Sequence, residues 1–187
     1  MKKFVMAALC SAFVATPTLA DNTGKYYVAG DFGSAIYNNV TVQARTYPNP
    51  WMLRVAGGYH FSPSLAMEVG YSMFTDSSLP GGATISASSF QIAAVGSFPV
   101  NDEFDFTAKI GLANNNHTLD GELMGATVRS FSSSHTDLLF GIGTQFHVNP
   151  HITVRAQCDS FGEFGNFATT DKSMVASVFT IGVAYTF

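Results

Sequence analysis

The sequence contains little charge. Only 12% of its 187 residues are Asp, Glu, Lys or Arg, whereas 47% are hydrophobic. A chain with few charges and many apolar residues is not intrinsically disordered. Nine Lys and Arg against thirteen Asp and Glu also exclude the basic surface that a nucleic-acid-binding protein needs. Because soluble proteins carry about twice this fraction of charged residues, part of the surface is expected not to face water.

The N-terminal segment has the features of a secretory signal. Two lysines precede the apolar run Phe4–Val14, and Thr18-Leu19-Ala20 offers small residues at the two positions that a signal peptidase reads. We predict that residues 1–20 are a signal peptide cleaved before Asp21. Residues 21–187 have the length of a single domain.

The sequence of the exported chain offers neither a disulfide bond nor a transmembrane helix. Once Cys10 is removed with the signal, Cys158 is the only thiol, so no intramolecular disulfide can form. No run of eighteen apolar residues follows the signal, so no transmembrane helix is predicted. The domain must therefore be stabilised in another way.

Apolar residues instead alternate with polar or small ones at a period of two, the pattern of a sheet with one apolar face. Charged residues avoid the apolar face of the clearest segments and occupy the opposite one: Arg54, Glu68, Asp105, Lys109, Arg155 and Asp159. We count eight such segments, which are Tyr26–Phe32, Leu53–Phe61, Leu65–Met73, Phe90–Phe98, Phe104–Leu112, Leu138–Phe146, Ile152–Asp159 and Phe179–Phe187.

Short and long connections alternate between these segments. The short ones carry Pro or Asn, as tight turns do: Ser62–Ser64, Pro99–Glu103 and Val148–Pro150. The long ones are rich in Asn, Ser, Thr and Gly: Tyr37–Pro50, Thr75–Ser89, Asn114–Thr136 and Gly162–Ser173. Short turns at one rim and long polar loops at the other are typical of an outer-membrane barrel, in which closure pairs every backbone group.

The predicted fold is therefore all-β, an eight-stranded antiparallel up-and-down transmembrane β-barrel. The alternative is a soluble barrel or sandwich that buries the apolar face and exposes the charged one, and alternation alone does not separate the two. The scarcity of charge, the difference between the loops and the aromatic residues near the strand ends favour the membrane barrel.

Several stretches resemble those of the outer membrane protein A-like and opacity-type barrels. They are Tyr27–Gly33, Phe106–Gly111, Val154–Gln157 and the final segment Phe179–Phe187. In that family a terminal aromatic residue preceded by apolar residues at alternate positions resembles the signal read by the barrel-assembly machinery. The resemblance implies this role for Phe179, Ile181, Val183, Tyr185 and Phe187, and a location in the outer membrane of a Gram-negative bacterium.

The interior of an eight-stranded barrel is only wide enough for side chains to fill it. Asp31, Glu68, Lys109 and Arg155 are expected in roughly one neutral layer, with Arg54 above it, because each lies a few residues into its strand. Charges in a narrow lumen must be paired. Two interpretations follow: a salt-bridge network that holds the lumen shut, which we favour, or a gate that passes ions when pairs exchange partners, an idea that the resemblance also suggests.

Symmetric pairing about each short turn predicts the neighbours of these charges. Glu68 would face Gly58, Lys109 would face Ala93, and Arg155 would face Gly143, so that a small residue leaves room for each long side chain. Three further acidic residues, Asp105, Asp137 and Asp159, are expected near the rims, where water would solvate them and no special role is assigned.

Catalytic residues are not predicted, although one alternative stays open. Some eight-stranded outer-membrane barrels modify lipid A, and Ser132-Ser133-Ser134-His135 with Asp137 offers the residue types of an acyl hydrolase. Proximity in sequence is weak support, because a triad is recognised by its geometry. We therefore expect no enzyme activity.

The histidines do not form a metal-binding pattern. Two of them, His147 and His151, flank a turn rather than share a helix face; the turn leaves open whether they face each other, and no third ligand lies nearby. The remaining three, His60, His117 and His135, are interpreted as part of polar rims or loops. No metal and no cofactor are therefore predicted.

The sequence predicts a structural role at the cell surface, with at most a small gated conductance. Expected partners are outer-membrane lipid, lipopolysaccharide and the barrel-assembly machinery, with a host or surface ligand as a further candidate through the loops. The barrel is expected to be a monomer that binds no nucleic acid. The alternatives are a lipid A-modifying enzyme that uses rim residues such as His135, and a surface adhesin that acts through the extracellular loops.

Overall fold

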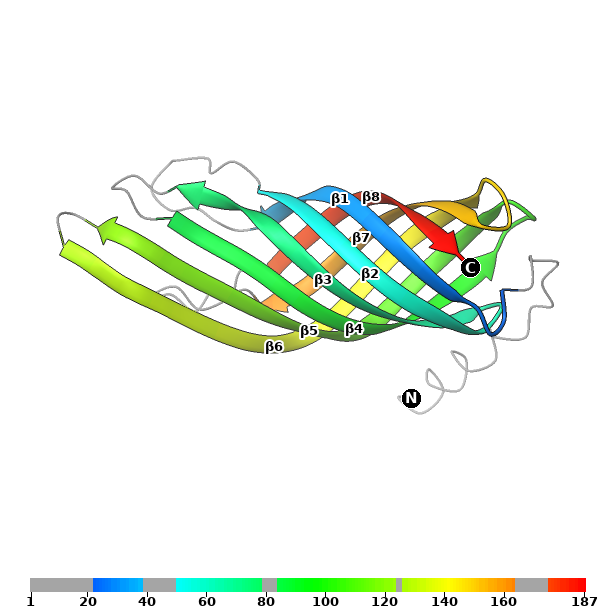
Figure 1. The fold of residues 1–187 in the computed structure, drawn as a ribbon, viewed down its shortest axis with the longest axis horizontal. Helices are drawn as coiled ribbons and strands as arrows, with labels where there is room; N and C mark the ends of the chain where they lie inside the picture. The colour runs from blue at the N-terminus through cyan, green and yellow to red at the C-terminus, as the bar shows by residue number, and fades with distance from the viewer. Residues whose placement is uncertain (1–21, 39–49, 79–83, 124–125, 164–174) are drawn as a thin grey trace, which may run out of the picture.

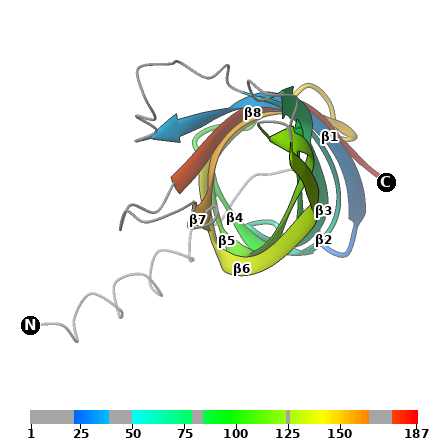
Figure 2. The same ribbon diagram turned by 90° about the vertical axis from the view of Figure 1, so that its left-hand side faces the viewer.

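The computed structural model describes residues 22–38, 50–78, 84–123, 126–163 and 175–187. They form one closed barrel in which each strand pairs antiparallel with its neighbours in sequence, and β1 closes onto β8 (Figures 1 and 2). The strands are β1 Tyr26–Asn38, β2 Trp51–Ser62, β3 Leu65–Ser78, β4 Thr84–Pro99, β5 Phe104–Leu123, β6 Ala126–His147, β7 Ile152–Glu163 and β8 Val175–Thr186. The predicted eight-stranded antiparallel barrel is confirmed. The predicted signal peptide lies outside the described residues and stays a prediction.

The alternation in sequence becomes an inside and an outside. In β2, Met52, Arg54 and Ala56 are buried in the barrel, whereas Leu53 and Val55 between them are exposed on its outer surface. Side chains of successive strand residues point to opposite faces of a sheet, so one segment supplies both surfaces. The apolar face is outside and the charged face inside, as the membrane-barrel interpretation predicted. No helix among the described residues is long and apolar enough to cross a bilayer.

One end of the barrel carries the short turns, and β1 begins and β8 ends there (Figure 1). We call this the short-turn end and the opposite one the long-loop end. The turns after β4 and β6 are closed by hydrogen bonds from the Val100 amide to the Phe104 carbonyl and from the Val148 amide to the Ile152 carbonyl, each 2.9 Å. In each of these hairpins the midpoint between paired residues lies one residue later in the sequence than the predicted pairings require.

This shift corrects two of the three predicted pairings. Glu68 faces Gly58 as predicted. In contrast, Lys109 faces Val95 rather than Ala93, and Arg155 faces Gln145 rather than Gly143. Moving the centre of a hairpin by one residue moves the partner by two, so every side chain keeps its face and only its level changes.

The long connection predicted over Asn114–Thr136 is wrong. The β5 strand continues to Leu123 and β6 begins at Ala126, so that the two strands pair far beyond the other strands at the long-loop end (Figure 1). Backbone pairing does not require apolar side chains, and a ladder outside the bilayer is free to be polar on both faces. The Asn and Ser residues that suggested a loop therefore lie in two paired strands.

Candidate functional site

The interior of the barrel holds a buried charged network with Arg155 at its centre. Arg155 on β7 binds Asp31 on β1 in a bidentate way, with Nε to Oδ1 and Nη2 to Oδ2 both 2.6 Å. Its remaining terminal nitrogen, Nη1, donates to Oε2 of Glu68 on β3 at 2.6 Å. One guanidinium thus joins two carboxylates that reach the lumen from different strands. The Tyr27 hydroxyl also donates to Glu68 Oε2, at 3.1 Å.

Arg54 on β2 extends the network. Its Nε donates to Asp31 Oδ2 at 2.7 Å, and its two terminal nitrogens donate to Asp159 and to the side-chain oxygen of Gln157. Asp31 therefore accepts from two arginines at once. Charge-assisted and bidentate hydrogen bonds of this kind are the strong ones, and they fix the orientation of both partners.

Lys109 on β5 completes the network. Its Nζ lies 2.8 Å from Glu68 Oε1, 3.2 Å from Gln157 Oε1 and 3.8 Å from Asp159 Oδ2. The structure thus brings together all five residues of the predicted network and adds one acidic residue. The three bases Arg54, Lys109 and Arg155 oppose the three acids Asp31, Glu68 and Asp159, so the buried layer is formally neutral.

The prediction that Asp159 is a solvated rim residue is wrong. Its side chain is only 1% exposed and pairs with Arg54. The sequence contained a signal for this, because Asp159 has the same parity along its segment as Arg155 and Gln157 and must therefore point inward. The prediction placed Asp159 too close to the rim, because it did not include the strand tilt that brings Arg54 of β2 and Asp159 of β7 together across the lumen.

An apolar layer lies beside the network on the side of the long-loop end. In β2 its member Met52 precedes Arg54 by two residues, and in β7 its member Phe161 follows Asp159 by two residues. Phe161 meets Phe74 edge to face, with ring centroids 6.3 Å apart. The layer consists of Ala35, Met52, Phe74, Ala93, Ala113, Leu139, Phe161 and Val178, all buried. This layer was not predicted from the sequence, although Phe74 and Phe161 are large apolar residues on the inward-facing, mostly polar side of their strands.

Glycines give the long charged side chains their space. A Cβ atom built on Gly182 of β8 would collide with the carboxylate of Asp31, and one on Gly141 of β6 would collide with that of Asp159. A lipid-facing glycine, Gly30, has nothing within 4 Å of its Cβ position.

This contrast leads to a prediction about two glycines on neighbouring strands. Gly182→Ala is expected to destabilise the barrel by about 1–3 kcal/mol, because the methyl group displaces Asp31 from its two arginines. Gly30→Ala is expected to be neutral or stabilising by up to about 1 kcal/mol, because it only reduces backbone freedom. Urea titration of the two variants in lipid vesicles measures both. If both variants changed the free energy of unfolding equally, Asp31 would not depend on the space beside Gly182.

The two histidines that flank the turn after β6 have separate partners. His147 does not face His151; its Nε2 lies 2.9 Å from Asp105 Oδ2, and its Nδ1 lies 3.0 Å from Thr153 Oγ1. His151 instead stacks on Tyr185. The prediction that Asp105 is solvated at the rim is also wrong, because Asp105 is only 2% exposed.

The proposed hydrolase residues do not assemble as a triad in the part that the structure describes. The Ser134 hydroxyl donates to Asn114 Oδ1 at 3.2 Å, whereas His135 Nε2 lies 3.2 Å from Asp137 Oδ1. Adjacent strand residues point to opposite faces, which separates Ser134 from His135. The side chains of Ser132, Ser133 and His117 lie outside the described residues. Among the side chains that are described, no group of three or more His, Cys, Asp or Glu could hold a metal ion.

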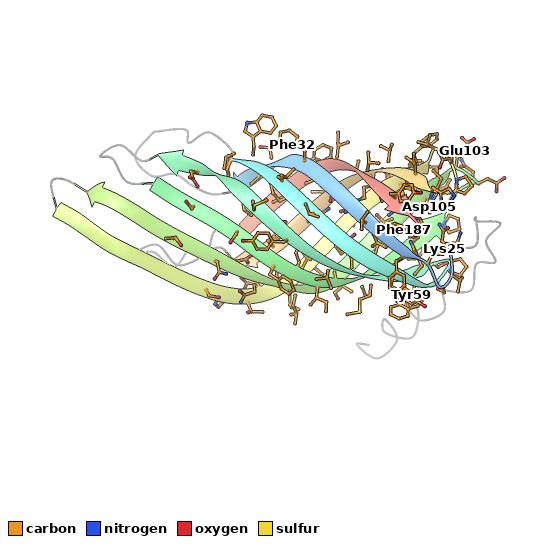
Figure 3. All side chains as sticks on the ribbon, viewed as in Figure 1. Lys25, Phe32, Tyr59, Glu103, Asp105 and Phe187 are labelled. Atoms are coloured by element: carbon orange, nitrogen blue, oxygen red, sulfur yellow. The ribbon has the colours of Figure 1, made fainter. Side chains whose placement is uncertain are left out.

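The outer surface carries aromatic residues at two levels. Figure 3 labels Tyr59 and Phe187 near the short-turn end and Phe32 further along the outer face. At the short-turn end Tyr26 packs on Tyr59, and at the other level Phe32 stacks on Trp51, with centroids 4.8 and 5.0 Å apart. The residues of the predicted assembly signal all lie on the exposed outer face: Phe179, Ile181, Val183, Tyr185 and Phe187. Two aromatic girdles around an apolar belt are the surface of a barrel that spans a membrane.

The family model described as "Outer membrane protein beta-barrel domain" matches residues 6–187. The chain belongs to this family. Its location is accordingly the outer membrane of a Gram-negative bacterium, and its resemblance to outer membrane protein A-like barrels is confirmed. Among curated protein sequences, none matches this outer-membrane barrel.

Solved structures show the same fold. The attachment invasion locus protein of Yersinia pestis has a TM-score of 0.61 at 15% identity, and the match covers 88% of this chain and 99% of the other. Neisserial surface protein A has a TM-score of 0.62 at 19% identity, with 87% and 97% covered. The N-terminal β-barrel domain of Pseudomonas aeruginosa OprF has a TM-score of 0.58 at 14% identity, with 88% and 100% covered. At these identities the likeness concerns the fold alone.

Proposed function

We propose that this outer-membrane barrel is a closed structural element of the envelope that presents its loops at the cell surface and is not an open pore. The observation that carries the proposal is the filling of the lumen. A neutral network of six paired charges lies next to an apolar layer of eight buried residues across the same interior. No enzyme activity is part of this role.

The two layers block ions by different physical means. An ion that enters the charged layer must replace an existing partner of Arg54, Lys109 or Arg155, each of which is already bonded to carboxylates. An ion that enters the apolar layer loses its hydration and meets mainly apolar side chains, with only neutral polar groups such as Gln91 and Asn115 beside them, which is the larger penalty. We therefore place the main barrier at Phe74, Phe161 and their neighbours.

Conductance of a charge-network variant separates a plug from a gate. Purified wild-type barrel in a planar bilayer is expected to show no steady open-channel steps. Glu68→Gln, which weakens the pairing of Arg155 and Lys109, is expected to stay closed because the apolar layer is untouched. Asp76→Asn, which changes an exposed carboxylate that accepts a hydrogen bond from the Ser86 hydroxyl, is the matched control. Frequent openings in Glu68→Gln but not in Asp76→Asn would establish the gate and overturn the plug.

The partners of this role follow from the same surfaces. The apolar belt would be surrounded by outer-membrane lipid and lipopolysaccharide. The outward residues of β8 would be read by the barrel-assembly machinery before the monomeric barrel closes. Truncation of Phe187 followed by measurement of outer-membrane assembly tests the second of these.

Surface binding is a second candidate function, favoured by the β5–β6 hairpin. Its two strands pair from the barrel up to Leu123 and Ala126, beyond the ends of their neighbours (Figure 1). A long, paired, polar hairpin is a rigid platform for contact with a host or surface ligand. Loss of binding to host cells when residues 118–132 are replaced by a short turn, with the barrel still assembled, would support it.

A further inference from the structure

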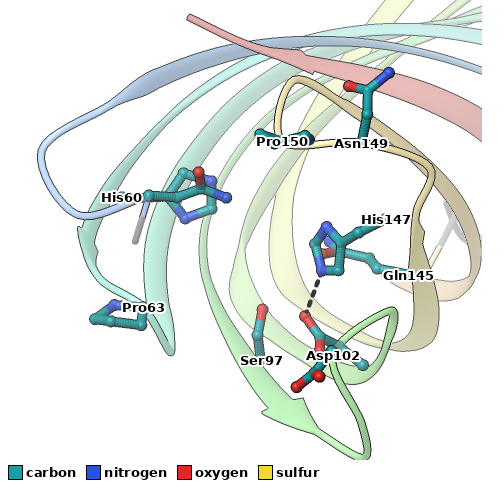
Figure 4. Close-up of a pocket in the computed structure, with 10 residues that line it drawn as sticks. His60, Pro63, Ser97, Asp102, Gln145, His147, Asn149 and Pro150 are labelled. Carbon is teal, nitrogen blue, oxygen red and sulfur yellow. Dashed lines mark hydrogen bonds and ion pairs between the residues drawn. The ribbon is translucent and has the colours of Figure 1, made fainter. Parts of the chain in front are cut away.

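The lumen is not filled at the short-turn end. A cavity of about 190 Å³ opens there between β2, β4, β5 and β6, and Figure 4 shows His60, Ser97, Gln145 and His147 around it. A smaller cavity shares these four residues and continues inward to Tyr27 and Arg155. The two form one polar vestibule that ends at the charged network, with the apolar layer beyond it. In an outer-membrane barrel this end faces the periplasm.

The lining of the larger cavity is acidic. Asp102 and Asp105 contribute carboxylates, and none of the Lys and Arg residues that the structure describes lines it. The other polar groups are amides, one hydroxyl and the rings of His60 and His147. With neutral histidines the formal charge of the lining is negative, so the vestibule favours a cation over an anion or a neutral solute.

Two buried acceptor atoms in this lining receive no hydrogen bond. One is Oδ1 of Asp105, a side chain that is almost fully buried, and the other is Oδ1 of Asn22. Leaving a buried acceptor unpaired is unfavourable, and more so when it is charged. A ligand with several hydrogen-bond donors and a positive charge would therefore complement this lining.

The remaining contacts hold Asp105 in place. Its Oδ2 lies 2.9 Å from His147 Nε2, and the other ring nitrogen of His147 is 3.0 Å from Thr153 Oγ1. His147 is therefore a positioning residue, since it holds Oδ2 of the carboxylate and leaves Oδ1 without a hydrogen bond. Across the cavity the ring of His60 packs against Tyr27, with centroids 5.0 Å apart. The site is built before any ligand arrives.

We propose that this vestibule binds a small molecule with a primary ammonium group, which enters from the periplasm and donates to Asp105 Oδ1 and Asn22 Oδ1. An ammonium group has three donors and no acceptor, which matches two unpaired acceptors in an acidic cavity. The cavity is smaller than the roughly 300–1,000 Å³ of drug-sized sites, so the ligand is a short aliphatic amine. A metal ion fits less well, because no group of three or more ligating His, Cys, Asp or Glu exists in the described part of the chain.

Ethanolamine and ethylene glycol form a matched pair of probes, because they differ by an ammonium group in place of a hydroxyl. The folded barrel in lipid nanodiscs is titrated with each, and backbone amide resonances are followed by NMR. Ethanolamine is expected to give saturable shifts centred on Asp105, His147 and Gln145, and ethylene glycol is expected to give none. Equal shifts with both probes would show that the ammonium group is not recognised and would overturn the proposal. No saturable response to either probe would show a vestibule that holds only water.

Two variants test separately whether binding needs the Asp105 carboxylate and whether it needs the volume of the cavity. Asp105→Asn is expected to weaken ethanolamine binding at least tenfold. Ser97→Leu, which fills the cavity without changing charge, is expected to do the same. Asp137→Asn, at the long-loop end beside His135, is the control and is expected to bind normally. Unchanged binding in both cavity variants would overturn the site.

Two further measurements complete the test. A heat-dependent shift in gel mobility verifies that each variant is folded, so that a lost signal is a lost site. Magnesium chloride is titrated in parallel. If magnesium produced the same localised shifts at lower concentration than ethanolamine, the vestibule would be a metal site and the ammonium assignment would fail.

Discussion

Arg155→Met is expected to lower the free energy of unfolding by about 3–5 kcal/mol, the typical result of removing one partner from a buried ion pair. Arg155 makes three hydrogen bonds of 2.6 Å to Asp31 and Glu68. Methionine fills a similar volume, so the loss of packing is small and the unpaired negative charge dominates. Urea titration in lipid vesicles, followed by fluorescence of the single tryptophan, Trp51, measures the change.

A double substitution isolates the electrostatic part of this effect. Arg155→Met combined with Glu68→Gln restores a neutral lumen, in which Asp31 and Asp159 are balanced by Arg54 and Lys109. The double variant is expected to be more stable than the sum of the two single losses predicts. Strict additivity would mean that Arg155 and Glu68 do not interact energetically, in contradiction to the network.

Val69→Arg is expected to destabilise the barrel by about 2–4 kcal/mol, because a charge on the lipid face must leave water. Val69 lies in the middle of β3 on the outer face, between Met67 and Tyr71, and its cross-strand neighbours are Gly57 and Ile92. None of these neighbours offers a counter-charge. The same urea titration measures the effect.

Val100→Arg is the matched control. Val100 is also exposed, but it lies in the turn after β4, where its amide rather than its side chain makes the turn hydrogen bond. The substitution is expected to change stability by less than about 0.5 kcal/mol. Similar effects at both positions would contradict the assignment of the outer belt to lipid.

Much of the barrel followed from local chemistry. A period of two in side-chain character requires a sheet with two unlike faces, and this is visible in any single segment such as Leu65–Met73. The strand ends were less predictable. The polar residues from Asn114 to Thr136 look like a loop because apolar alternation stops where the membrane stops, although the backbone ladder continues.

The candidate site was predictable in composition but not in connectivity. Parity along a strand places Asp31, Arg54, Glu68, Lys109 and Arg155 on the inner face, and the structure brings them together. Whether a given acid meets a given base depends on turn centres and on strand tilt. Both act between strands that are far apart in sequence, so no single segment contains the information.

The sequence by itself determined a sheet with two unlike faces, and its scarcity of charge, its loop pattern and its aromatic strand ends favoured a closed barrel with the apolar face outside, because a sheet in lipid must pair every backbone group. Only the tertiary structure decided that Asp159 belongs to the buried network, that Phe74 and Phe161 pack against each other beside it, and that Asp105 borders a cavity with an unpaired oxygen. These features depend on which strands face each other across the lumen and at what level. That relation is set when β1 pairs with β8 and closes the barrel.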